Sequence, residues 1–165
     1  MNIFGRLAGF HCLVDVFRRK AIYKFEKIAV PAGFEKLFAA HAQLLRVLTE
    51  KCDIGIRIKT AYDAGDREAL AALASRLDTL ACDMRSFCGL RAAVWYENNK
   101  PFGFEVLLSN LSAVIGLTEN AAVRIRAYLD GEVPSLPELE AERLTYSAKG
   151  TPFVMETTPA SIMIP

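Results

Sequence analysis

The feature that most constrains the fold is a helical hydrophobic repeat, which runs through most of the chain and is interrupted at four turn signals. Apolar residues recur every three or four positions, the spacing that places them on one face of an α-helix. Proline and the residue before it leave the helical backbone, and glycine is common just after a helix end. The interruptions are Pro31 with Gly33, Gly65-Asp66, Asn98 to Pro101, and Asp130-Gly131.

These signals set the bounds of the predicted helices. The apolar faces cover Phe10–Ile28, Phe34–Tyr62, Leu70–Trp95 and Leu107–Tyr128, with Gly65 in a left-handed conformation and Asp66 as the N-cap of the third helix. Ser135 with Glu138 fits a capping box, which predicts a short helix over Glu138–Leu144.

Short connections between long helices favour antiparallel neighbours. We therefore expect an all-α fold, an antiparallel up-and-down four-helix bundle with a short extra C-terminal helix and an extended tail. The predicted bundle domain spans residues 1–146, and the tail, which is nearly uncharged, spans residues 147–165.

Composition narrows the classes of partner and compartment. The chain has 165 residues, which suits one domain, and its 52% hydrophobic content is high enough to suggest apolar surface that a partner covers. A net charge of +1 gives no reason to expect nucleic acid or an anionic membrane. No uncharged apolar run reaches the ~18 residues of a membrane span, so no membrane partner is expected. The four scattered cysteines predict reduced thiols in a cytoplasmic protein.

The sequence lacks the residue patterns of a catalytic, metal or cofactor site. His11 and His41 are the only histidines, and neither belongs to a metal-binding motif. Phosphate-binding glycine motifs and a nucleophile elbow are missing, and no Asp is followed directly by Glu. We therefore expect no catalytic residue, no metal and no cofactor in this chain.

The segment Trp95–Val106 breaks the helical repeat with aromatic, polar and turn-forming residues. Two interpretations remain open for it. The aromatic residues either pack internally or stack on sugar, and the polar residues either shape the turn and cap the next helix or line the rim of an active site. The candidate interdomain or substrate-rim residues are Trp95, Tyr96, Asn98, Asn99, Lys100 and Glu105.

The uncharged stretch from Val106 to Thr118 is a second candidate surface. A helix that is apolar on more than one face is usually buried, so this stretch is either the central helix of the bundle or a contact with a second copy of the chain. Both interpretations are consistent with its small residues, which allow close helix approach.

Four segments, taken in order, carry a resemblance to a known family. They are Cys12–Phe17, Ile54–Asp66, Glu97–Val106, and Tyr128–Gly131 continuing through Pro137–Glu140. Their order and spacing over roughly residues 10 to 146 are similar to the C-terminal helical domain of bacterial β-N-acetylhexosaminidases of glycoside hydrolase family 20. The most specific piece is the run Glu-Asn-Asn-Lys-Pro-Phe-Gly-Phe-Glu-Val, residues 97–106.

The resemblance implies an accessory, non-catalytic domain of a glycoside hydrolase of carbohydrate metabolism that removes terminal N-acetylhexosamine. It also implies two partners: the catalytic barrel of the same enzyme, against which the domain packs, and a second copy in a homodimer. The family's catalytic Asp-Glu pair has no match here, and its usual arginine and glycine pair after residue 106 are replaced by Asn110 and Ser112-Ala113. The alternative is a stand-alone helical module for protein–protein interaction.

Overall fold

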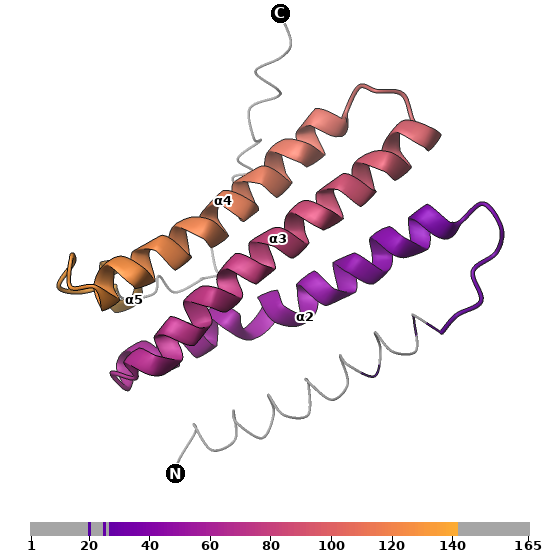
Figure 1. Cartoon of the computed structure of the whole chain (residues 1–165). Coiled ribbons are helices and arrows are strands. Elements are labelled where there is room, and N and C mark those ends of the chain that lie inside the picture. The colour runs from indigo at the N-terminus through magenta and orange to yellow at the C-terminus, as the bar shows by residue number, and fades with distance from the viewer. Residues whose placement is uncertain (1–19, 21–24, 26, 142–165) are drawn as a thin grey trace, which may run out of the picture.

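The described part of the chain is entirely helical. The computed structural model describes residues 20, 25 and 27–141, and the bounds of its elements are Glu35–Asp63 for α2, Arg67–Asn98 for α3, Phe104–Leu129 for α4 and Pro137–Glu140 for α5 (Figure 1). The all-α class is confirmed for these residues. The first predicted helix lies almost entirely outside them, as do residues 142–144 and the tail. The four-helix bundle and the boundary at residue 146 therefore stay predictions.

Ion pairs between neighbouring helices show that the three long helices run antiparallel. In each pair of helices, a residue early in one helix meets a residue late in the next. Figure 1 shows the same arrangement, with α3 between α2 and α4, and both outer helices pack on α3. The ion pairs are Lys36–Glu97 and Glu50–Arg76 between α2 and α3, and Asp78–Arg126 and Arg85–Glu119 between α3 and α4.

The turn between α2 and α3 forms as the sequence predicts. Gly65 has a φ of 65°, the left-handed conformation that glycine adopts without a steric penalty. Its amide donates a 3.0 Å hydrogen bond to the carbonyl of Tyr62. Asp66 then caps α3, because its carboxylate accepts a 2.9 Å hydrogen bond from the amide of Ala69.

The hydrophobic core follows the middle helix. Leu70 and Leu80 of α3 are 0% and 2% exposed, which makes them two of the largest fully buried side chains. Burial of one such side chain stabilises the fold by roughly 1.5–3 kcal/mol. The outer helices complete the same cluster with Val47, Ile54, Ile58 and Ala61 from α2, and Ile115, Ala122 and Ile125 from α4.

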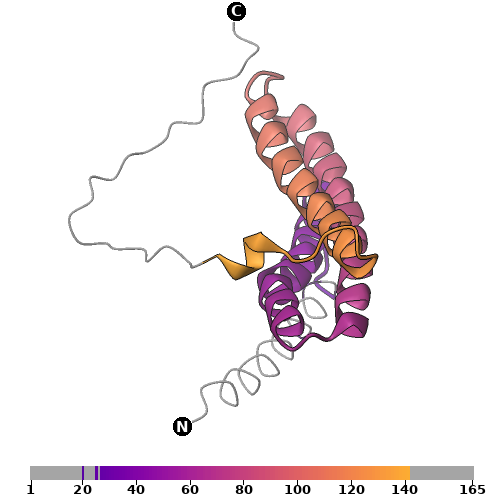
Figure 2. The ribbon, with the colours of Figure 1, turned by 90° about the vertical axis from the view of Figure 1, so that its left-hand side faces the viewer.

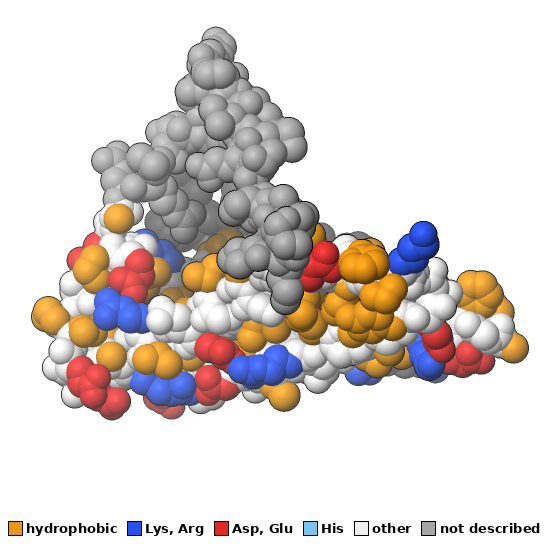
Figure 3. Space-filling view, turned by 90° about the horizontal axis from the view of Figure 1, so that it is seen from above, with side chains coloured by type: hydrophobic (Ala, Val, Ile, Leu, Met, Phe, Trp, Pro, Cys, Tyr) orange, Lys and Arg blue, Asp and Glu red, His pale blue; other side chains and the backbone are white. Residues whose placement is uncertain are grey.

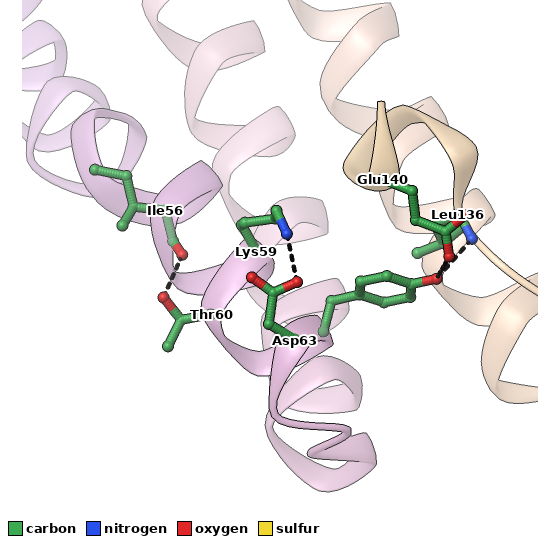
Figure 4. A network of polar contacts seen from close by, with 7 residues as sticks. Ile56, Lys59, Thr60, Asp63, Leu136 and Glu140 are labelled. Atoms are coloured by element: carbon green, nitrogen blue, oxygen red, sulfur yellow. Dashed lines mark hydrogen bonds and ion pairs between the residues drawn. The ribbon is translucent and has the colours of Figure 1, made fainter. Parts of the chain in front are cut away.

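The segment after α4 folds back over one end of the bundle and is held by Tyr62 (Figures 2 and 4). The Tyr62 hydroxyl accepts a 3.0 Å hydrogen bond from the amide of Leu136 and donates a 2.6 Å bond to Glu140. The bond to Glu140 raises the pKa of Tyr62, because it favours the protonated phenol. Leu136 is 1% exposed and belongs to the core.

The predicted capping box at the start of the short helix is wrong. Leu136 is the N-cap of α5, and no side chain of this residue makes a capping hydrogen bond to the helix. The hydroxyl of Ser135 instead donates a 3.3 Å hydrogen bond to Glu140. The physical reason is Pro137: its fixed φ suits the first helical position, so the helix begins there and Ser135 lies one residue too early to cap it.

Helix α4 is apolar yet lies at the outside of the described bundle. By length and composition alone it could cross a membrane, with a mean hydropathy of 1.4 in its most apolar window; one such helix is weak evidence for a membrane span. Only 11% of that window is buried. Among the three long helices the central one is α3, so the interpretation of Val106–Thr118 as the central helix is wrong for the described residues. Its contact with a second copy stays a prediction.

Candidate functional site

The corner between α3 and α4 contains all six candidate residues, and its polar side chains first serve the end of α3. The helix ends at Asn98, and the amide of Asn99 donates a 2.8 Å hydrogen bond to the carbonyl of Trp95. The side-chain amide of Asn98 donates to the carbonyl of Val94 at 2.9 Å, and that of Asn99 donates to the carbonyl of Trp95 at 3.3 Å. The carbonyl of Trp95 thus accepts both the backbone amide and the side-chain amide of Asn99, and the two asparagine side chains reinforce the last turn of α3.

Trp95 holds the corner together from within. Its indole Nε1–H donates a 2.9 Å hydrogen bond to the carbonyl of Lys100, across the turn that follows the helix. The ring centroid lies 5.8 Å from that of Phe104, which is 4% exposed. The half-buried indole is thus engaged on its polar edge and on its ring, which is the internal packing that one of the two interpretations expected.

Gly103 and Glu105 begin the next helix. Gly103 is the N-cap of α4 with a φ of 99°, in the region that favours glycine. The Glu105 carboxylate accepts a 2.8 Å hydrogen bond from the amide of Gly103, which places a negative charge at the positive end of the helix dipole. Glu105 therefore caps α4, which is the role that the turn-shaping and capping interpretation of the polar residues expected.

Once these internal bonds are counted, three apolar side chains of the corner point to solvent. Phe102 is 85% exposed, Tyr96 is 58% exposed and Val106 is 50% exposed. The ring of Tyr96 contacts Phe104 at a centroid distance of 5.3 Å, so its position is fixed although its surface is open. The side chain of Lys100 is also exposed beside them.

Phe102 was missed by the sequence analysis, which treated it as part of a family-like run without singling it out. A usable signal was present, because Phe102 lies between Pro101 and Gly103 in a turn. A turn exposes its middle side chains, so a large apolar residue there has few internal partners. Figure 3 shows hydrophobic side chains gathered toward its right-hand side, which is the side of this corner in Figure 1.

The start of α2 lies at the same end of the bundle. The ion pair of Lys36 with Glu97 joins the first turn of α2 to the last turn of α3. The segment that leads into α2 carries three more exposed apolar side chains, of Ile28, Val30 and Phe34, which are 48%, 39% and 52% exposed. This end of the bundle therefore collects apolar surface from three separate segments.

The ionisable groups of the described chain are arranged for helix packing. Asp78 on α3 accepts from both terminal nitrogens of Arg126 on α4, which lowers the pKa of the Asp78 carboxyl. The hydrogen bond from Arg124 likewise lowers the pKa of Glu138. Among the described residues, no three His, Cys, Asp or Glu side chains form a group that could hold a metal ion. The chemistry that the corner offers is apolar contact on a rigid backbone.

Comparison with known proteins gives one family. The family model described as Glycoside Hydrolase 20C C-terminal domain matches residues 15–155 of the chain. A search of curated proteins finds no match. The matched range covers every described helix and contains the corner between α3 and α4.

Proposed function

We propose a function from one premise: the chain belongs to the family of glycoside hydrolase 20C C-terminal domains. It serves as the accessory, non-catalytic domain of a β-N-acetylhexosaminidase, an enzyme that removes terminal N-acetylhexosamine. Its partner is the catalytic barrel of the same enzyme, against which it packs. The family match carries this proposal, since the matched family is itself named for the C-terminal domain of a glycoside hydrolase.

The chemistry of the described residues supports an accessory role. Glycoside hydrolysis commonly needs a pair of carboxyl groups that flank the scissile bond. Five carboxylates of the described residues instead pair with a lysine or arginine on another helix: Glu97, Glu50, Asp78, Glu119 and Glu138. Their chemical task is to align the helices.

The unburied apolar surface supports a packing partner. Apolar side chains at the corner and along α4 remain in contact with water in the isolated chain, which is unfavourable in proportion to their area. Contact with a second domain removes that area from water. Interfaces between domains of one enzyme commonly use such mixed apolar and polar surfaces.

An activity measurement on two polypeptides tests the proposal. The purified chain should release no p-nitrophenol from p-nitrophenyl N-acetyl-β-glucosaminide. A longer polypeptide, which also contains the residues encoded upstream of Met1, should release it. Steady turnover by the purified chain alone would contradict the accessory role. An upstream region that encodes no barrel with an Asp-Glu pair would favour the stand-alone interaction module instead.

A further inference from the structure

We propose that residues 14–24, which belong to the predicted helix over Phe10–Ile28, dock on a second face of α2. The second face of α2 is defined as Phe38, Ala42, Leu45 and Thr49, which recur every three or four positions and are half-buried. In this arrangement α2 lies between the docked segment and α3, in a row of successive antiparallel helices. A closed four-helix bundle would instead bring the first helix against α4 as well.

The second face of α2 points away from α3. Lys36, Gln43 and Glu50 make polar contacts between α2 and α3, and they recur every seven residues. Phe38 follows Lys36 by two residues, and Leu45 follows Gln43 by two. Because an α-helix turns by about 100° for each residue, a shift of two residues places a side chain about 200° around the helix axis. A partner other than α3 is therefore needed to bury these side chains.

The chain that precedes α2 already touches this face. Phe25 stacks on Phe38, with ring centroids 5.5 Å apart and ring planes at 22°. Residues 20 and 25 are both helical, and the amide of Ile28 donates a 3.2 Å hydrogen bond to the carbonyl of Phe25. Since only a short connection separates Ile28 from the start of α2 at Glu35, an antiparallel arrangement is favoured.

The stack of Phe25 on Phe38 sets the register of the contact. In an antiparallel pair of helices, each step back from Phe25 matches a step forward from Phe38. Counted in this way, apolar or small residues of the segment fall opposite the members of the second face to within one residue. The pairs are Ala21 with Ala42, Phe17 with Leu45, and Val14 with Thr49.

The exposure of α2 gives the same length for the contact. Thr49 is the last half-buried member of the second face, and the next residues at the same spacing, Cys52 and Ile56, are exposed. Phe38 and Thr49 are eleven residues apart, which is about 16 Å along a helix. A helix that reaches back eleven residues from Phe25 arrives at Val14. The contact therefore occupies the second face of α2 and leaves α4 open to a partner.

A disulfide between two introduced cysteines tests the proposal in the full chain. Helices about 9 Å apart, with Cα atoms about 2.3 Å from each axis, bring facing Cα atoms to about 4–5 Å, which a disulfide can bridge. The test pair is Ala21→Cys with Ala42→Cys, in a chain whose four native cysteines are replaced by alanine. With oxidised glutathione it should close at least about tenfold faster than a control pair, because docking raises the effective concentration of the two thiols. The control is Ala21→Cys with Ala113→Cys, since Ala113 is exposed on α4.

Three results would overturn the proposal. Equal rates for the two pairs, in chains that circular dichroism shows to be folded, would mean that the segment is not held on α2. Faster closure of the control pair would place the segment on α4, as in a closed bundle. A disulfide-linked dimer on a non-reducing gel would assign the second face of α2 to the segment of a second copy.

The wild-type chain offers a measurement that needs no substitution. Nuclear Overhauser contacts should join the ring protons of Phe17 to the methyl groups of Leu45, because the register places these side chains side by side. The ring of Phe17 should show no such contact with Val123, which is 60% exposed on α4. Contacts of Phe17 with Val123 and none with Leu45 would overturn the proposal even if the cysteine variants fail to fold.

Discussion

Replacement of Gly103 by alanine should destabilise the chain, although it adds only one methyl group. The backbone at Gly103 has a φ of 99°, where a residue with a Cβ is strained by about 1–2 kcal/mol. A Cβ at this position would lie 3.4 Å from the Trp95 ring, which leaves no room for the turn to relax toward the indole. We therefore expect the free energy of unfolding to fall by about 1–2 kcal/mol and the melting temperature by roughly 2–8 °C.

Gly116→Ala provides a control with the opposite sign. Gly116 lies inside α4, and a Cβ there meets nothing within 4 Å. Because glycine is a poor helix former, alanine should stabilise the chain by about 0.5–1 kcal/mol. The two glycine-to-alanine variants should thus differ by roughly 1.5–3 kcal/mol in unfolding free energy.

Urea unfolding followed by two probes measures the effect. Circular dichroism reports the helices, and fluorescence reports the corner, because Trp95 is the single tryptophan of the chain. Equal slopes for wild type and variants would show that the native and unfolded states are comparable. A Gly103→Ala variant as stable as wild type, or more stable, would refute the left-handed turn and with it the rigid presentation of Phe102.

Two further predictions concern the polar contacts between elements. Arg126 lowers the pKa of Asp78, so this pair stabilises the fold above the usual carboxyl value of 3.8 and loses its contribution as the pH falls below it. Between pH 6 and pH 3 wild type should therefore lose more unfolding free energy than Asp78→Asn, and parallel curves would refute the pair's role. Tyr62→Phe removes the acceptor of the Leu136 amide and should accelerate hydrogen exchange at that amide, measured by NMR. Exchange at the amide of Leu80 should stay unchanged. Unaltered exchange at Leu136 would contradict the role of the Tyr62 hydroxyl in holding this segment.

The turns that end the helices were predictable because their signals are local. Gly65 and Asp66 determine their turn through their own backbone preference and side chain, and the structure confirms both. The end of α3 at Asn98 was predictable for the same reason, because Pro101 closes the helical run. In each case the deciding interaction lies within four residues of the signal.

The rest depended on contacts that are distant in sequence. Tyr62 and Leu136 are 74 residues apart, and no local pattern indicates that the phenol accepts from that amide. The central place of α3 also escaped prediction, because α4 is the more apolar helix in sequence and burial depends on which helices flank it. At the corner, the residue types were recognised, but their direction was not. Only the structure shows that Trp95 turns inward and Phe102 outward.

The central position of α3 has a consequence for how the domain forms. Each outer helix packs on the helix next to it in sequence, so the described fold consists of two successive hairpins that share one member. Chains dominated by such local pairings fold fast, since little loop entropy is lost before contacts form. On the ribosome, the hairpin of α2 with α3 can assemble before α4 has been synthesised, and α4 then adds to a surface that already exists. A domain built in this order spends little time in an unfolded, aggregation-prone state.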